Sequence, residues 1–237
     1  MKKTMLLEEA IRKGIIAVGD VSKGILGDYI EYKTERKNCV LTPEQTGWPE
    51  EQLFKTEHLN WRLEKVGDEV ILIADDATMS KIYLKGKIGY EKGIDSMNYL
   101  CGKLYTNFLA ENVIIVNGDM FERGVSYCAS SYWVDSSSSD IYFGTEYFCI
   151  RIASSGRMID SFLYGLNGNA YSGYYGIRPI VFLKPDVWVE IPEEIEDYGS
   201  NKKAWHIFYP SKSELEQLIK ECEERISKAK KALDDMK

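Results

Sequence analysis

Side chains that commonly carry acid–base or nucleophilic chemistry are thinly spread in this chain. The two histidines, His58 and His206, lie far apart in the sequence. A general base works only when the proton it removes is within hydrogen-bond reach. The sequence contains no Gly-rich phosphate loop, HExxH or GxSxG motif to supply a partner. We therefore expect structural histidines and no enzyme activity.

The segment 126–176 instead has a composition typical of a binding surface. It holds 8 of the 16 tyrosines, with 11 serines, 6 glycines and 2 asparagines, and it has no lysine. Tyrosine offers a large amphipathic contact at low entropy cost, and Ser, Gly and Asn add adaptable hydrogen bonding. Its ionisable residues are few: Asp135, Asp140, Glu146, Arg151, Arg157 and Asp160. The segment predicts recognition of a partner without chemical change.

Most of the expected contact residues lie in or beside a Gly-rich loop that precedes the last apolar strand. The predicted ligand-binding residues are Tyr132, Asp135, Tyr142, Tyr164, Asn167, Asn169, Tyr171, Tyr174 and Tyr175. The alternative is that these tyrosines pack on the surface of their own domain. For Asp135 and the serines 136–139, a solvated loop is favoured over a cation site. Trp61 and Trp133 are expected in the core, and Arg178 is expected to pair internally with a carboxylate.

Composition excludes several classes of protein. A net charge of −7 argues against nucleic acid as the main partner, because phosphate binding needs a basic face. The five cysteines form no CxxC or Cys/His cluster, so we expect no zinc site, no other cofactor and mostly buried free thiols, although Cys128 and Cys149 could pair. Glu8 and Glu9 interrupt any signal-peptide core, and no apolar run approaches the length of a membrane helix. We expect synthesis in a bacterial cytoplasm without a signal peptide.

Hydrophobic periodicity predicts a mixed α+β chain. We expect an N-terminal helix within residues 1–14, an irregular loop over 34–56, a hairpin over 59–74 and a helix over 93–109. Further strands are expected at 28–32, 81–84, 127–133, 141–152, 157–164 and 177–183. Residues 135–140 and 165–176 are expected to be loops, and Pro179 suggests an edge strand or a bulge.

The C-terminal part is expected to be a Pro-bounded acidic linker over 189–210 followed by a helix over 211–237. The apolar residues of this helix follow a 4-3-4-3 spacing typical of a heptad seam. They are Leu215, Ile219, Cys222, Ile226, Ala229, Leu233 and Met236. The seam favours self-association through a coiled coil, and the alternative is one amphipathic helix packed on its own domain.

Six segments of the chain resemble proteins found in phages and prophages of Gram-positive bacteria. The matching residues are 27–32, 61–74, 82–105, 132–134, 154–157 and, most specifically, 176–183, which reads GIRPIVFL. The last segment resembles the closing strand of C-type-lectin-like domains of the formylglycine-generating-enzyme type. Retroelement-diversified display proteins use that fold to present variable side chains. The resemblance implies a C-type-lectin-like domain over residues 15–188, with small twisted antiparallel sheets, two short helices and long loops.

Some family features are missing. Trp133 is followed by Val-Asp-Ser where many relatives have Ala-Ser-Arg, and the Glu-Pro-Asn and Trp-Asn-Asp triplets of calcium-dependent lectins do not occur. The reactive cysteine pair of the enzyme does not map onto Cys128 and Cys149, so catalysis is not implied. The resemblance implies a virion protein that recognises a protein or glycan on a host surface. The alternative is a structural or assembly protein that uses its Tyr-rich face to bind other virion proteins.

Overall fold

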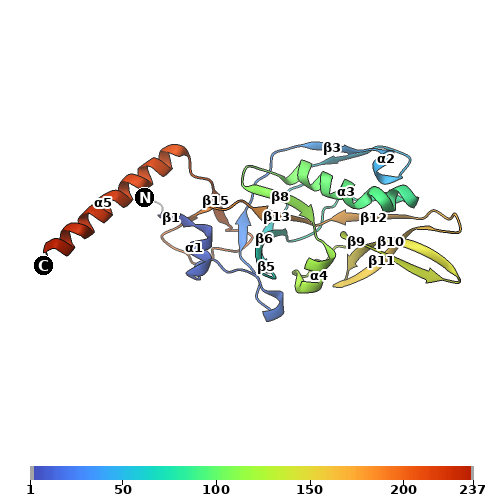
Figure 1. Ribbon diagram of the computed structural model, residues 1–237, viewed down its shortest axis with the longest axis horizontal. Coiled ribbons are helices and arrows are strands. Elements are labelled where there is room, and N and C mark those ends of the chain that lie inside the picture. Colours follow the sequence, from blue (N-terminus) through green and yellow to red (C-terminus); the bar gives the residue numbers. More distant parts are fainter. Residues whose placement is uncertain (1–2, 236–237) are drawn as a thin grey trace. The chain divides into compact units, whose positions relative to one another are not determined.

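A computed structural model of the chain describes residues 3–235, in which strands outnumber helices (Figure 1). The chain divides into two compact units, Met1–Ile207 and Phe208–Lys237. The first unit combines an eight-stranded sheet, a five-stranded sheet and a two-stranded hairpin with helices. The α+β class expected from the sequence is therefore confirmed.

The hairpin predicted over residues 59–74 forms two neighbouring strands of the eight-stranded sheet and contributes to the hydrophobic core. Trp61 and Leu63, two residues apart on one strand, point to the same buried face, and Leu72 pairs with Leu63 from the other strand. All three side chains are buried. Gly67 adopts φ +64° at the turn, a conformation that favours glycine. In spatial order, the strands are β1 (Lys3–Leu6), β14 (Trp188–Ile191), β15 (Trp205–Phe208), β2 (Tyr29–Glu31), β5 (Trp61–Val66), β6 (Glu69–Ala74), β13 (Pro179–Leu183) and β8 (Ala110–Ile115).

Strands of the five-stranded sheet replace one predicted loop and part of another. In spatial order, they are β11 (Arg157–Gly165), β10 (Thr145–Ser154), β9 (Tyr132–Tyr142), β12 (Ser172–Ile177) and β7 (Ile82–Lys85). The expected loop over 135–140 is strand because its serines pair with β10, for example Ser137 with Ile150. Residues 172–176 of the other loop pair with β7 and β9. Tertiary pairing here overrides weak local strand propensity.

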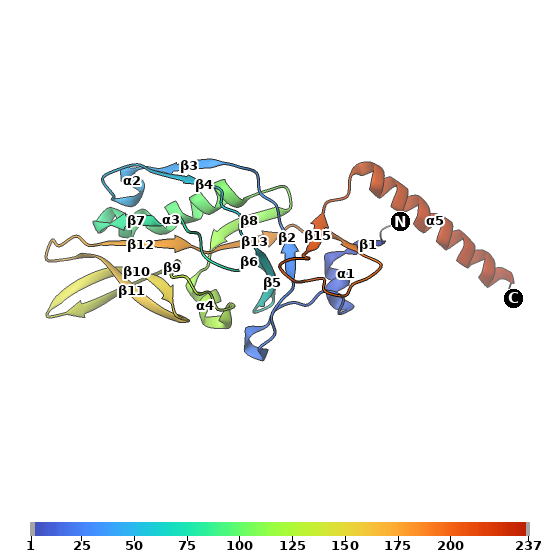
Figure 2. The same ribbon diagram turned by 180° about the vertical axis from the view of Figure 1, so that it is seen from behind.

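Helix α3 (Gly86–Tyr105) lies between the two-stranded hairpin and the larger sheets (Figure 2). It begins seven residues before the predicted start, and glycines let it approach the sheet closely. A Cβ added at Gly93 would lie 2.7 Å from Leu84 Cδ1. The hairpin, β3 (Asn38–Leu41) and β4 (Gln52–Lys55), encloses α2 (Pro43–Thr46). The expected irregular loop over 34–56 is therefore wrong, because Leu41 and Phe54 are buried against the core.

Both ends of the first unit also differ from expectation. The expected helix within 1–14 begins as β1, which pairs with β14, and continues as α1 (Leu7–Arg12). The linker expected over 189–210 instead supplies strands, because Val189 and Trp205 are buried in the core. The domain boundary expected near residue 188 therefore moves to residue 207. The remaining helices are η1 (Val21–Lys23) and α4 (Gly118–Gly124).

A buried arginine occupies the point at which the chain passes from one sheet to the other. Arg178 separates β12 from β13 and has no exposed surface. Its guanidinium donates to the Ala74 carbonyl (2.7 Å), the Ser126 carbonyl (2.6 Å) and the Ser126 hydroxyl (2.8 Å). The expected carboxylate partner is replaced by these oxygens, while the buried Glu64 accepts from the Ser126 backbone amide (3.1 Å). Pro179 opens the interior strand β13 rather than an edge strand, which is allowed at the first position of a strand.

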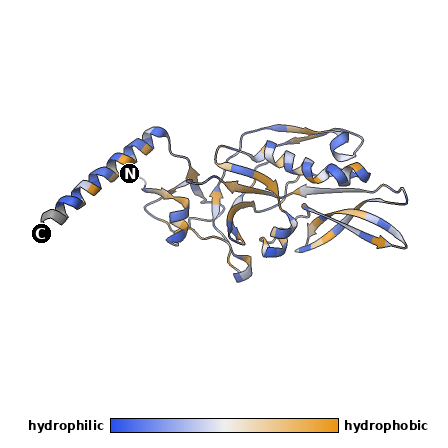
Figure 3. Ribbon diagram, viewed as in Figure 1, coloured by the Kyte–Doolittle hydropathy of each residue, from blue (hydrophilic) through white to orange (hydrophobic). Residues whose placement is uncertain are grey.

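The second unit is dominated by α5 (Lys212–Asp235), which is mostly hydrophilic with isolated apolar residues (Figure 3). Leu215, Ile219 and Ile226 are exposed along the predicted seam, as are Cys222 and Ala229. Met236 lies outside the described residues, and the side chain of Leu233 is not described. None of the helices in residues 3–235 has the length and apolar character needed to cross a membrane.

Replacing Arg178 with methionine should strongly destabilise the first unit. Two backbone carbonyls and a hydroxyl would lose a buried donor, which costs about 2–4 kcal/mol in total. Urea unfolding followed by circular dichroism would measure this loss. Arg157→Met at an exposed position serves as the control and should change stability by less than about 0.5 kcal/mol. Equal stability of the two variants would contradict the role given to Arg178.

Candidate functional site: an aromatic hollow

The two faces of the five-stranded sheet carry different side chains. Successive strand residues point to opposite faces, so Phe148 and Ile150 face α3 together with Trp133. Tyr147 on β10 and Phe162 on β11 project from the other face. We call this second side the outer face of the sheet. It carries most of the exposed aromatic surface of segment 126–176.

Five aromatic residues surround a hollow of about 280 Å³ on the outer face. They are Tyr142, Phe143, Tyr147, Phe162 and Tyr171. The ring centroid of Phe162 lies 5.5 Å from that of Tyr142 and 5.5 Å from that of Tyr147, at interplanar angles of 83° and 73°. Tyr171 closes the group, 6.0 Å from Tyr147. The edge-to-face contacts of Phe162 are favoured between aromatic rings, and they hold its ring nearly perpendicular to those of Tyr142 and Tyr147.

A tight turn places Phe143 at the rim of the hollow. The turn joins β9 to β10 through Phe143 and Gly144, with φ of +49° and +77°. Glycine adopts this region readily, whereas phenylalanine does so at an energetic cost. Phe143 is fully exposed, at 107%, and the neighbouring Ile141 is 70% exposed. So much exposed apolar surface at one hairpin tip is typical of a contact site.

Two asparagines from the loop after β11 contact tyrosine hydroxyls at the rim of the hollow. The Asn167 side-chain amide donates to the Tyr147 hydroxyl (3.5 Å), and the Asn169 amide donates to the Tyr171 hydroxyl (3.3 Å). The loop is fixed to the hairpin by backbone hydrogen bonds, including that from Leu166 to the Glu146 carbonyl. These contacts orient the tyrosine rings without filling the space between them.

Carboxylates give this part of the outer face a negative character. Asp140 pairs across the strands with Tyr147, and Asp160 accepts from the Ser138 hydroxyl (2.7 Å) and lies 3.4 Å from Arg151. The negative charge of Asp140 raises the pKa of the Tyr142 phenol, and Asp160 adds to the rise, because both carboxylates disfavour a phenolate. Arg151 offsets Asp160, so Asp140 supplies the remaining charge.

A second aromatic group follows β7 and β12. Tyr83 and Tyr174 are directly opposite each other on the two strands, with stacked rings 5.3 Å apart. Trp48 extends the row, 4.9 Å from Tyr83. Lys81 lies over the ring of Tyr174 at 5.1 Å, and Lys85 lies 6.0 Å from that of Trp48. This row therefore already has its own cations.

Four of the predicted contact residues have structural partners instead. Tyr132 is 2% exposed and lies in the core beside Arg178, so its assignment to a ligand surface is wrong. Asp135 accepts from the Asn98 side-chain amide (2.8 Å), which fixes β9 against α3. Tyr164 stacks on Phe148 at 4.5 Å, on the α3 face, and Tyr175 packs edge-on against Trp133 at 5.0 Å.

The other predicted residues lie at the surface. Tyr142, Tyr171, Asn167 and Asn169 meet at the hollow, and Tyr174 belongs to the second aromatic group. The walls formed by Phe143, Tyr147 and Phe162 were not predicted from the sequence. Along residues 145–154, alternation places Tyr147 on the face opposite to that of the apolar Phe148. This pattern could have identified Tyr147 as a surface residue. The contribution of Phe162 depends on strand pairing, which the sequence did not predict.

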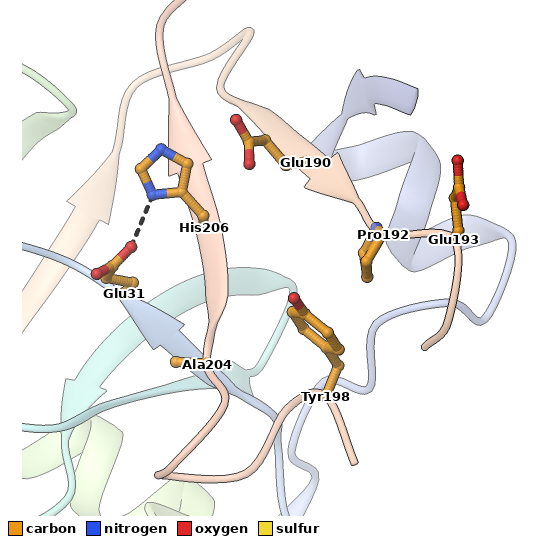
Figure 4. A pocket seen from close by; sticks show the side chains of 7 residues that line it. All are labelled: Glu31, Glu190, Pro192, Glu193, Tyr198, Ala204 and His206. Carbon is orange, nitrogen blue, oxygen red and sulfur yellow. Dashed lines mark hydrogen bonds and ion pairs between the residues drawn. The ribbon is translucent and has the colours of Figure 1, made fainter. Parts of the chain in front are cut away.

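A larger hollow of about 750 Å³ lies elsewhere in the first unit (Figure 4). It is lined by Glu31, Glu190, Pro192, Glu193, Tyr198, Ala204 and His206. His206 Nδ1 lies 2.7 Å from Glu31 Oε2. Lys33, and then His206, hold the pKa of Glu31 below its usual range. The lining offers no serine, cysteine, threonine or lysine nucleophile.

The possible metal ligands and the cysteine thiols can be considered for residues 3–235. Across 3–235, no group of three or more His, Cys, Asp or Glu side chains could hold a metal ion. All five cysteines are free, and four are buried, as expected from the sequence. Burial raises the pKa of the Cys128 and Cys149 thiols to about 11, so neither is an activated nucleophile.

Replacing Asp140 with asparagine should lower the pKa of Tyr142, because the phenolate would no longer form beside that carboxylate. Titration of ¹³C-tyrosine resonances by NMR, with Tyr142→Phe used to assign the signal, measures the change. Glu146→Gln is the matched control, since Glu146 alternates to the other face of β10. An unchanged Tyr142 titration in Asp140→Asn would contradict the electrostatics described for the hollow.

Comparison with protein-family models, curated proteins and solved structures finds no match for this chain. The residues themselves are therefore the guide to function. The most distinctive arrangement is the ring of aromatic side chains at the exposed tip of β9–β11, with amides at its rim and carboxylates beside it.

Proposed function

We propose that the protein is a non-enzymatic recognition protein that binds a ligand or receptor through the aromatic hollow. The observation that carries the proposal is the clustering of five aromatic side chains around an open hollow at a hairpin tip. Aromatic residues are enriched at binding hot spots because they bury large areas with little loss of entropy. A folded domain gains nothing by exposing Phe143 fully to water, so an occupant is the natural explanation.

We further propose a scaffold of the C-type-lectin-like kind and an origin in a phage or prophage. The support is the resemblance of six segments, among which residues 176–183 span Arg178 and form the end of β12 and all of β13. In this proposal the protein resides in the virion and contacts a protein or glycan on a host surface. Clustering of copies would strengthen weak single-site binding through avidity.

A structural or assembly role is the second candidate. It is favoured by the exposed apolar residues Ile141 and Phe143, which suit burial against another subunit as well as contact with a ligand. Under this reading the aromatic tip would contact another virion protein. The two candidates differ in whether the purified protein binds host-derived material.

Replacing Tyr142, Tyr147 and Tyr171 together with alanine should reduce binding to host cell-wall preparations or arrayed glycans by more than about tenfold, because three hot-spot rings would be lost. Biolayer interferometry on the full chain measures the change. The matched control is Tyr99→Ala, an exposed tyrosine on α3 outside the hollow. Wild-type binding by the triple variant would contradict recognition through the hollow.

We also propose that α5 associates with α5 of another copy in a coiled coil. Leu215, Ile219 and Ile226 recur along one stripe and are exposed, so a second helix could bury them. Cys222 lies on the same stripe and is the only exposed cysteine of the five. It therefore reports on helix pairing without competing thiols at the surface.

Mild oxidation of the full chain should give a disulfide-linked dimer if the helices pair in parallel, because the two Cys222 side chains would then face each other across the seam. Non-reducing gel electrophoresis measures the product, and Cys222→Ser should abolish it. Light scattering gives the mass of the unoxidised protein. A monomeric mass over the tested concentrations would contradict association through α5.

A further inference from the structure

Several aromatic rings outside the aromatic hollow have a lysine positioned over them. Lysines lie over the rings of Tyr174, Trp48, Tyr99 and Tyr198, at 4.4–6.0 Å. Among residues 3–235, no Lys or Arg lies over the rings of Tyr142, Tyr147, Phe162 or Tyr171. Segment 126–176 contains no lysine that could reach them.

The electrostatics of the hollow suit a positive ligand. Aromatic faces attract cations through the ring quadrupole, and perpendicular walls present several such faces to one space. Tyr142, Tyr147 and Phe162 meet at 70–83°. Asp140 lies across the strands from Tyr147, and its charge acts on Tyr142. A cation held among the rings would therefore also be attracted by a carboxylate.

The shape and polarity of the hollow favour an organic cation over a bare metal ion or a neutral sugar. The lining is aromatic, so it offers no set of oxygen ligands for a metal. Asp140 beside the rings adds a negative charge, which attracts a cation and not a neutral sugar. A volume of about 280 Å³ accommodates a small headgroup.

We propose that the aromatic hollow binds a small organic cation of the alkylated-ammonium class, with Tyr142, Tyr147, Phe162 and Tyr171 as its walls and Asp140 as its counter-charge. The proposal rests on the recognition function above and names the ligand class for the same site. The cation would be the exposed headgroup of a larger surface molecule, and the remainder of that molecule would lie outside the hollow.

Choline and its neutral isostere 3,3-dimethylbutan-1-ol test the proposal directly, because they share shape and differ in charge. NMR titration of the full chain with each compound, at low salt, should give saturable shifts of the Tyr142, Tyr147 and Tyr171 rings with choline. The isostere should bind at least about tenfold more weakly, since it loses the attraction to the ring faces and to Asp140.

Two variants locate the effect. Asp140→Asn should weaken choline binding several-fold, whereas Glu146→Gln, on the other face of β10, should leave it unchanged. Tyr147→Leu keeps an apolar side chain and should abolish the preference for choline over the isostere. Equal binding of both compounds would overturn the proposal in favour of a purely hydrophobic hollow, and so would the absence of any saturable shift in the folded protein.

Failure of this test is distinguishable from failure of the recognition function. If choline does not bind but the Tyr142/Tyr147/Tyr171 triple variant still loses host-surface binding, the cation class is wrong and recognition through the hollow stands. If choline binds selectively and the triple variant keeps its host-surface binding, the ligand class stands and the host surface is the wrong partner.

Discussion

Arg178 and its oxygen partners constrain the whole first unit, because they fix the point at which the chain leaves one sheet and enters the other. The chain runs through β12 in the five-stranded sheet and then through β13 in the eight-stranded sheet, with Arg178 between them. A guanidinium with no exposed surface needs partners for its donors. Ala74 at the end of β6 and Ser126 ahead of β9 provide them. The arginine thus ties together both sheets and the start of the segment that carries the hollow.

The hollow depends on that framework through strand alternation. Trp133 is buried on the α3 side of the sheet, where its indole N–H donates to the Ile82 carbonyl (3.1 Å). Its position determines which side chains of β9, β10 and β12 project from the outer face. A Cβ added at Gly173 would lie 2.7 Å from the Trp133 ring, so β12 can pass over the tryptophan only because that residue is glycine. This close packing fixes which face of each strand is buried, so the aromatic rings at the alternate positions project from the other face.

Local patterns predicted the β5–β6 hairpin, the strands of the Tyr-rich segment and the burial of Trp61 and Trp133, because alternation and turn residues are local signals. They failed where long-range pairing decides the structure. The serines 136–139 have low strand propensity but lie in β9, and the acidic, Pro-bounded stretch after residue 188 contributes strands through a few buried residues such as Trp205. Composition identified segment 126–176 as a surface of interest. It did not distinguish Tyr132, which faces the core, from Tyr142, which faces solvent.

Residue-resolved oxidative footprinting of the full chain measures which aromatic rings solvent reaches, and therefore whether the hollow is open. We expect rapid modification of Tyr142, Phe143 and Tyr171, and protection of Tyr105, Tyr132 and Trp133, which are 0–2% exposed. Protection of Tyr142 and Phe143 equal to that of Tyr105 would contradict an open aromatic hollow, since the framework anchored by Arg178 would then hold those rings inside the fold.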